Sequence, residues 1–136
     1  KKFPDTLQIS ILEYSAIAYF KKNKLIYLIN DNFKNSLIDN NANLENLIEV
    51  KNMKNMKDFK TFFLKITNED VFFSKIKVIN YVHDGRWDVV LKNGQLIKLG
   101  NYNLNKQVKY LNFILNNQTA KIIDLRYEGR VILANE

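Results

Sequence analysis

The sequence predicts an α+β domain with a largely antiparallel β-sheet and two packed α-helices. Three observations support this fold class. Segments of alternating apolar and polar residues, typical of strands with one buried face, recur along the chain. Residues 53–66 and 103–116 instead repeat apolar residues every three or four positions, which indicates amphipathic helices. Short polar turns separate neighbouring strands, as expected where strands pair antiparallel.

The first part of the chain predicts an opening strand and a hairpin. Residues 5–20 begin with strict alternation of apolar and polar positions, which indicates a half-buried strand. Residues 25–29 and 35–38 form a pair of extended segments around the turn-forming residues 30–32, so a hairpin is expected there. Residues 39–52 show no sustained period and predict a loop that crosses the surface.

The middle of the chain predicts a helix followed by three antiparallel strands. Met53, Met56, Phe59 and Phe63 follow helical spacing, so their stripe is expected in the core. The strands are rich in β-branched and aromatic residues and are expected at residues 75–82, 87–91 and 95–99. The Asn93-Gly94 pair between the last two is a strong hairpin signal.

The last part of the chain predicts a helix and a final strand. Leu104, Val108, Leu111 and Leu115 repeat at helical spacing and place the helix at residues 103–116. Residues 122–127 alternate and predict a strand, which Glu128-Gly129 interrupts and residues 131–133 resume. We expect its alternate residues Ile123, Leu125 and Tyr127 to face the core, and Asp124 and Arg126 to form a solvated outer row. Trp87 is also expected in the core.

Composition describes one ordinary globular domain of 136 residues, with 46% hydrophobic and 26% charged residues. The net charge of +7 would suit an anionic partner, but 18 of the 21 cations are Lys and only 3 are Arg. The Lys residues are scattered, and the 20 Asn point to the residue usage of an AT-rich genome. Surfaces that read phosphates usually cluster their charge and favour Arg, so no nucleic-acid partner is expected.

The residues offer no arrangement suited to catalysis. Cysteine is absent, His83 is the single histidine, and no serine has the flanking glycines of a nucleophile elbow. No converging ligand set for a metal and no glycine-rich phosphate loop can be assembled, so neither cofactor nor metal is expected. The sequence therefore predicts a binding protein and not an enzyme.

Four motifs, in order along the chain, resemble the FtsQ/DivIB family of bacterial cell-division proteins. Residues 3–18 are similar to the closing strand of that family's POTRA domain, WPxxLxIxxxExxPxA, with Phe instead of Trp and Ala instead of Pro at two positions. Residues 86–100 are similar to its WxxxLxNGxxxxLG hairpin. The helix at 103–116 and the DLRY strand at 124–127 follow in the family's order.

The resemblance implies the periplasmic part of a single-pass inner-membrane protein at the bacterial division site. Residues 1–20 would close a truncated POTRA domain, and residues 21–136 would form the family's β domain. A membrane helix is implied upstream of Lys1. The implied partners are FtsB-like and FtsL-like division proteins, together with other membrane proteins of the divisome. The expected role is a non-catalytic scaffold that helps to assemble and regulate septal cell-wall synthesis.

The candidate binding site lies on the last predicted strand and the residues after it. A strand at the end of a chain tends to lie at a sheet edge, where unpaired N–H and C=O groups accept an added strand. We expect residues 124–133 to accept a strand from the FtsB-like partner, with Tyr127 as an aromatic anchor, although an ordinary core role for Tyr127 stays open. Arg86 or Arg126 would pair with acids of the partner. The candidate partner-binding residues are Arg86, Asp124, Arg126, Tyr127, Glu128, Arg130, Val131 and Ile132.

Two alternatives remain open at this point. A POTRA-type module of an outer-membrane assembly or secretion factor would share the opening strand, but tandem repeats of the module would then be expected and the chain has none. A basic nucleic-acid-binding domain is the alternative of another class and rests on the net charge alone.

Overall fold

A computed structural model describes residues 16–39, 41–67, 70–117 and 119–135, and its chain folds into two compact units, residues 1–51 and 52–136. Both carry β-sheet and the second also carries helices, so the predicted α+β class is confirmed. No helix in the described ranges has the length and apolarity to cross a bilayer.

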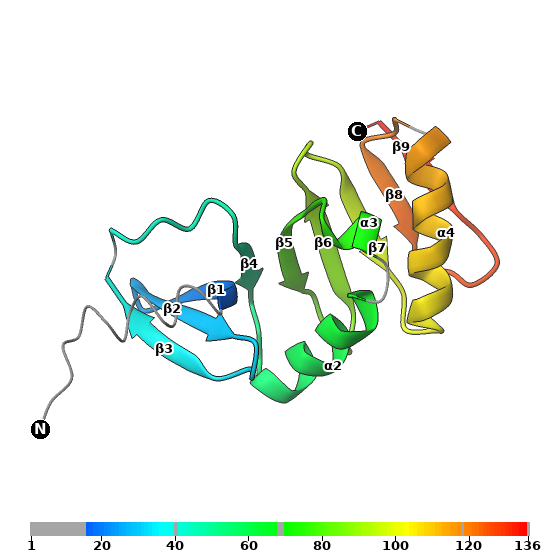
Figure 1. The fold of residues 1–136 in the computed structure, drawn as a ribbon. Helices are drawn as coiled ribbons and strands as arrows, with labels where there is room; N and C mark the ends of the chain where they lie inside the picture. The colour runs from blue at the N-terminus through cyan, green and yellow to red at the C-terminus, as the bar shows by residue number, and fades with distance from the viewer. Residues whose placement is uncertain (1–15, 40, 68–69, 118, 136) are drawn as a thin grey trace, which may run out of the picture. The chain divides into compact units, whose positions relative to one another are not determined.

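The first unit is a four-stranded sheet in the order β3-β2-β1-β4 (Figure 1). The predicted hairpin is confirmed, since the second and third strands pair antiparallel, while the first and fourth pair in parallel. The predicted opening strand is confirmed from Ala16 onward, and residues 5–15 of that prediction lie outside the described residues. The strands are β1 (Ala16–Lys22), β2 (Leu25–Asn30), β3 (Asn35–Ile38) and β4 (Ile48–Lys51).

The core of the first unit explains why the predicted loop at 39–52 is partly wrong. Ile26, Leu28 and Ile38 form a buried cluster against which Leu44 and Leu47 pack. The segment therefore stays close to the sheet and ends as β4, whose Ile48 and Val50 alternate inward. Four residues in an Asn-rich stretch are too few to show a strand period on their own.

The second unit is a five-stranded sheet in the order β5-β6-β7-β8-β9 with its helices on one face (Figure 1). Neighbouring strands pair antiparallel except β7 and β8, which are parallel and joined by a helix. The short α3 was not predicted, because four residues are too few to show a helical period. The elements are α2 (Met56–Ile66), α3 (Asp70–Phe73), β5 (Ile76–Tyr81), β6 (Trp87–Leu91), β7 (Leu96–Leu99), α4 (Leu104–Asn117), β8 (Ile122–Leu125) and β9 (Ile132–Ala134).

Strand register divides the second sheet into two faces. Ile79, Val89, Ile97 and Ile123 lie opposite one another across four strands and are all 0% exposed, so they form the centre of the core under the helices. The helices contribute Phe59, Phe62, Phe63 and Ile66 from α2 and Val108, Leu111 and Ile114 from α4. On α4 it is Ile114, and not the predicted Leu115, that is buried.

Trp87 lies in the core, as predicted, and is 4% exposed. Its ring stacks on Phe62, with centroids 5.1 Å apart and an interplanar angle of 16°, and meets Tyr81 edge-on at 5.1 Å. Phe59 lies 6.3 Å away. Trp87 thus joins β5, β6 and α2 through rings from three elements.

The turn between β7 and α4 is organised by one buried amide. The Gln107 side chain, 2% exposed, accepts a hydrogen bond from Gly100 N–H at 2.9 Å and donates to the carbonyls of Gly100 and Tyr102 at 3.0 and 2.9 Å. Tyr102 in turn donates its hydroxyl to Leu125 O at 2.7 Å. A side chain at Gly100 would place its Cβ 2.7 Å from Arg126 O, so only glycine fits there. This turn therefore holds the end of β8.

Candidate protein-binding site

The strand that ends the second sheet is β9 and not β8. The expectation that the 122–127 segment forms the edge is wrong, because β8 lies between β7 on one side and β9 on the other. Residues 126–131 form a connection that lets the chain return antiparallel, with Asp124 opposite Ile132. Within the described part of the chain, β9 has β8 as its single sheet neighbour. Ile132 and Leu133 of β9 are 39% and 41% exposed.

Asp124 and Arg126 form an ion pair in which the acid is buried. The Asp124 residue is only 5% exposed, so its predicted place on a solvated outer row is wrong. The guanidinium donates through Nε at 2.9 and 3.1 Å and through Nη2 at 2.7 Å, and the Arg126 backbone N–H adds a bond of 3.0 Å. Burial opposes ionisation of Asp124, but these bonds outweigh it and lower the pKa of the carboxyl.

Arg86 is also engaged within the chain. Its Nη1 donates to Leu99 O at 3.0 Å and lies 3.3 Å from Asp88 Oδ1, and its side chain is 14% exposed. Here burial dominates over the nearby guanidinium, so the pKa of Asp88 is raised. The expected use of Arg86 for acids of a partner thus requires it to leave an existing pair. Asp88, Lys98 and Asp124 lie in register across three strands and form a row of alternating charge.

The shifted pKa values of Asp124 and Asp88 predict opposite effects of pH on the stability of the protein. Because the folded-state pKa of Asp124 is lowered, wild type should exceed Asp124→Asn in stability near pH 7 and lose that advantage as the pH falls below about 4. Because the folded-state pKa of Asp88 is raised, wild type should gain stability relative to Asp88→Asn as the pH falls toward about 4. Urea unfolding of the three proteins near neutral pH and near pH 3 measures both trends; parallel trends in the two variants would contradict the assignment.

Tyr127 lies beyond the end of β8 and is 47% exposed. The strand alternation that placed it with Ile123 and Leu125 therefore stops before it, and an ordinary core position is excluded. Guanidinium carbons of Arg126 and Arg130 lie 5.3 and 5.4 Å from its ring centroid, within cation–π range. Arg130 N–H donates to Tyr127 O at 3.2 Å and closes the turn that brings both arginines to one ring.

The remaining candidate residues follow in the connection to β9 or in β9 itself. Glu128 and Arg130 are exposed and Val131 is partly buried. With part of α4 they line a shallow hollow of about 250 Å³, to which Lys106 and Tyr110 contribute. The structure thus brings together seven of the eight predicted residues around the β8–β9 connection. Arg86 is the exception, because it pairs with Asp88 of β6, and β7 with Lys98 lies between β6 and β8.

Comparison with known proteins shows to which family the chain belongs. Residues 18–126 match the model of the cell division protein FtsQ/DivIB, C-terminal family. The chain belongs to the FtsQ/DivIB family. It is also 24% identical over 135 residues to the cell division protein FtsQ of Rickettsia conorii (strain ATCC VR-613 / Malish 7), an alignment that covers 96% of this chain and 50% of the relative. The chain therefore spans about half the length of that relative.

The extent of the FtsQ/DivIB match separates two groups of candidate residues. Arg86, Asp124 and Arg126 lie inside the matched range, which ends at residue 126. Tyr127 and the candidate residues after it lie beyond the family model, although the FtsQ alignment covers nearly the whole chain. The resemblance to the family is thus confirmed, and the last residue of its DLRY motif, Tyr127, lies one position beyond the matched range.

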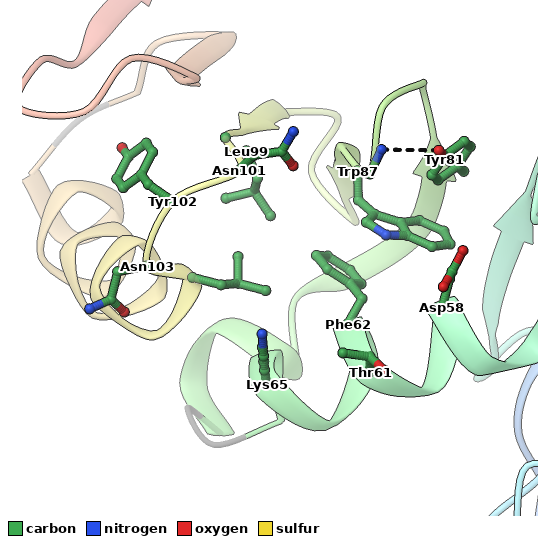
Figure 2. A pocket seen from close by; sticks show the side chains of 13 residues that line it. Asp58, Thr61, Phe62, Lys65, Tyr81, Trp87, Leu99, Asn101, Tyr102 and Asn103 are labelled. Carbon is green, nitrogen blue, oxygen red and sulfur yellow. Dashed lines mark hydrogen bonds between the residues drawn. The ribbon is translucent and has the colours of Figure 1, made fainter.

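A second hollow in this FtsQ/DivIB chain has a volume of about 540 Å³ and lies between α2 and the turn before α4 (Figure 2). Figure 2 shows Lys65 rising from α2 toward it, with Tyr102 and Asn103 on the opposite wall. The Phe62–Trp87 stack lines one side, and Tyr81 Oη accepts a 3.0 Å hydrogen bond from Gly85 N–H. Its lining includes polar and charged side chains, among them Asp58, Thr61 and Lys65.

Several residues of the site escaped sequence reasoning. Tyr110 and Phe113 are 49% and 66% exposed on α4. A signal was present, because Tyr110 and Phe113 are large aromatic residues outside the Val108–Leu111 stripe of their helix. Gln107 gave no signal, since a polar residue in a helix is ordinarily solvated.

Proposed function

We propose that this chain is a non-catalytic protein-binding domain that accepts a strand from an FtsB-like division protein along β9. The observation that carries the proposal is the position of β9, which ends its sheet with exposed apolar side chains and one strand neighbour in the described chain. An edge strand presents unpaired N–H and C=O groups, and an incoming strand satisfies them while its side chains add specificity.

The residues beside β9 suit an acidic partner strand. Arg126, Tyr127 and Arg130 form a cation–π group with the ring between two guanidiniums, and Tyr127 stays half exposed as an anchor. Arg130 is exposed beside the Tyr127 ring and can reach a carboxylate, whereas Arg126 already holds Asp124. The structure therefore favours Arg130 over Arg86 as the residue that pairs with acids of the partner.

The cellular role that we propose follows from the family. An FtsQ-type protein would be held at the division site by a membrane helix upstream of this fragment, with the present chain in the periplasm. Residues 1–20 would complete a POTRA domain and residues 21–136 would be the β domain. Binding of FtsB-like and FtsL-like proteins, and of other divisome membrane proteins, would make the chain a scaffold for septal cell-wall synthesis.

Proline substitutions test strand addition at single-residue resolution. In an antiparallel strand, successive N–H groups point to opposite sides, so one of Ile132 and Leu133 donates toward β8 and the other points outward. We expect the proline variant at the outward position to keep its thermal unfolding midpoint and to bind a soluble FtsB-like segment at least tenfold more weakly.

Calorimetry with the FtsB-like segment of the same organism measures the affinities, and Ile132→Ala and Leu133→Ala are the matched controls that keep the backbone N–H. Amide exchange of β9 with and without the segment gives a second measurement that needs no variant. Wild-type affinity in both proline variants, together with unchanged exchange at β9, contradicts the proposal.

A further inference from the structure

The hollow beside the Phe62–Trp87 stack has the size and setting of a ligand site. Its volume of about 540 Å³ falls in the range of roughly 300–1,000 Å³ that is usual for small-ligand sites. Its walls come from α2, from the β5–β6 hairpin and from the connection between β7 and α4, all within the second unit. The geometry of the hollow is therefore set within one compact unit.

The indole N–H of Trp87 is a buried donor at this hollow. Trp87 is 4% exposed, and the part of the chain that the structure describes offers its N–H no hydrogen-bond acceptor. Figure 2 shows the indole nitrogen pointing into the hollow. Because buried donors in proteins are nearly always hydrogen-bonded, the N–H requires an acceptor that enters from outside the chain.

Two sources of positive potential reach the same hollow. Lys65 is exposed, rises from α2 toward the hollow, and makes no ion pair or hydrogen bond with the described residues. The N-terminus of α4 lines the hollow at Asn103 and Leu104, and the first turn of this 14-residue helix contains no acid. Helix dipoles and first-turn N–H groups favour an anion at such an end. The acceptor that suits this hollow is therefore anionic.

Asp58 limits the charge of that ligand. It also lines the hollow and lies seven positions before Lys65 on the same face of α2, about 10.5 Å along the helix axis. Its carboxylate accepts a 3.1 Å hydrogen bond from Asn55 Nδ2 at the start of the helix and repels other anions. A ligand with one negative charge at the Lys65 end, such as a carboxylate, is therefore favoured over a multiply charged phosphate.

Two asparagines on the α4 side match a peptide group. Asn101 donates its side-chain N–H to Asp84 O at 2.7 Å, which leaves Oδ1 as an acceptor. Asn103 Oδ1 accepts from Lys106 N–H at 3.1 Å, which leaves Nδ2 as a donor. Neither remaining atom is hydrogen-bonded to another described residue. One acceptor and one donor are what the N–H and C=O of a peptide backbone need.

We propose that this hollow binds an acidic side chain of a peptide segment. Lys65 and the Trp87 indole N–H hold the carboxylate, and Asn101 and Asn103 pair with the backbone of the segment. Leu104, which is half-buried, contacts the methylene groups between them. The site goes beyond strand addition at β9, because its lining includes no residue of β9 and its ligand binds whether or not a strand is added there.

Nuclear magnetic resonance titration of the isotope-labelled chain with a capped glutamate, N-acetyl-glutamate N-methylamide, tests the proposal. Because Trp87 is the single tryptophan, its indole N–H gives one signal that reports directly on the hollow. We expect a saturable shift of this signal with a dissociation constant on the order of 1 mM, and none with the matching capped glutamine. Absence of a saturable shift up to about 50 mM capped glutamate, at constant ionic strength, overturns the proposal.

Variants of α2 separate a specific site from general attraction by a basic protein. Lys65→Ala should weaken binding of the capped glutamate about fivefold, and Lys65→Arg, which keeps the charge, should stay within about twofold of wild type. Lys57→Ala is the matched control, because Lys57 is an exposed lysine of the same helix outside the hollow. All three variants should keep the thermal unfolding midpoint. Equal weakening in Lys65→Ala and Lys57→Ala overturns the site.

Two further ligands identify the source of the negative charge. Sodium acetate and inorganic phosphate, at the same ionic strength, should each bind more weakly than the capped glutamate. Acetate that binds as tightly as the capped glutamate shows that the backbone is not recognised, which overturns the assignment to a peptide. Phosphate that binds more tightly shows a general anion site and overturns the selectivity attributed to Asp58.

Discussion

Replacement of Trp87 by Ala is expected to lower the free energy of unfolding of the second unit by about 3–5 kcal/mol, the cost typical of removing a large buried aromatic side chain. Trp87 is 4% exposed and contacts rings from β5 and α2, so its loss leaves a cavity at the junction of three elements. The stacked Phe62, which is 5% exposed, cannot fill a space of indole size without moving α2.

Urea unfolding followed by far-ultraviolet circular dichroism measures this effect, since Trp87 is the single tryptophan and its fluorescence disappears in the variant. Leu64→Ala, at a half-exposed position on α2, is the control and should change the stability by no more than about 0.5 kcal/mol. A cost below about 1 kcal/mol for Trp87→Ala would show that the ring is not an essential part of the core.

Replacement of Gln107 by Ala is expected to lower the free energy of unfolding by about 2–4 kcal/mol, because it removes three hydrogen bonds made by a buried side chain to partly buried backbone groups. Those groups are Gly100 N–H and the carbonyls of Gly100 and Tyr102. The same turn holds the end of β8 through Tyr102 and Leu125, so the variant should also loosen the segment that carries Arg126 and Tyr127.

Amide exchange distinguishes this local effect from a general loss of stability. In Gln107→Ala the Gly100 amide should exchange faster than the amides of β6, whereas global destabilisation would accelerate both equally. Lys106→Ala is the matched control, since Lys106 is the exposed neighbour of Gln107 on the same helix. Retained protection at Gly100 would show that the side-chain amide is not what holds the turn.

Local patterns predicted most elements of the second unit because the responsible interactions are close in sequence. The hairpin between β6 and β7 follows from Asn93-Gly94, where Gly94 takes a φ of 95°. The stripe on α2 follows from helical spacing, and the helix begins where Asn55 Oδ1 accepts a 2.8 Å bond from Asp58 N–H. The short β4 and α3 were missed, since four residues are less than one clear period of either pattern.

Motifs in the sequence were equally informative about family. The Trp87 hairpin and the segment that contains Asp124 and Arg126 both lie inside the range that matches the FtsQ/DivIB model. Such motifs consist of turn glycines and apolar core residues, and both can be recognised from residue type and spacing alone.

The candidate site needed the tertiary structure because its properties depend on neighbours that are distant in sequence. Alternation correctly divides β8 into two faces, but it does not reveal that β9 returns along β8 and becomes the edge. Nor does alternation show that Asp124, flanked by Lys98 on one side and Ile132 on the other, is buried and paired with Arg126.

Sequence patterns thus specified the α+β class, nearly every element of the second unit and the family, since periodicity, turns and motifs are local properties of the chain. The tertiary structure decided the properties of the candidate site. It places β9 and not β8 at the edge, and the fold pairs Arg86 with Asp88 and leaves Tyr110 exposed at the hollow that Val131 also lines. Burial and pairing of these side chains depend on which strand or helix lies next to them, and only the folded chain brings those neighbours together.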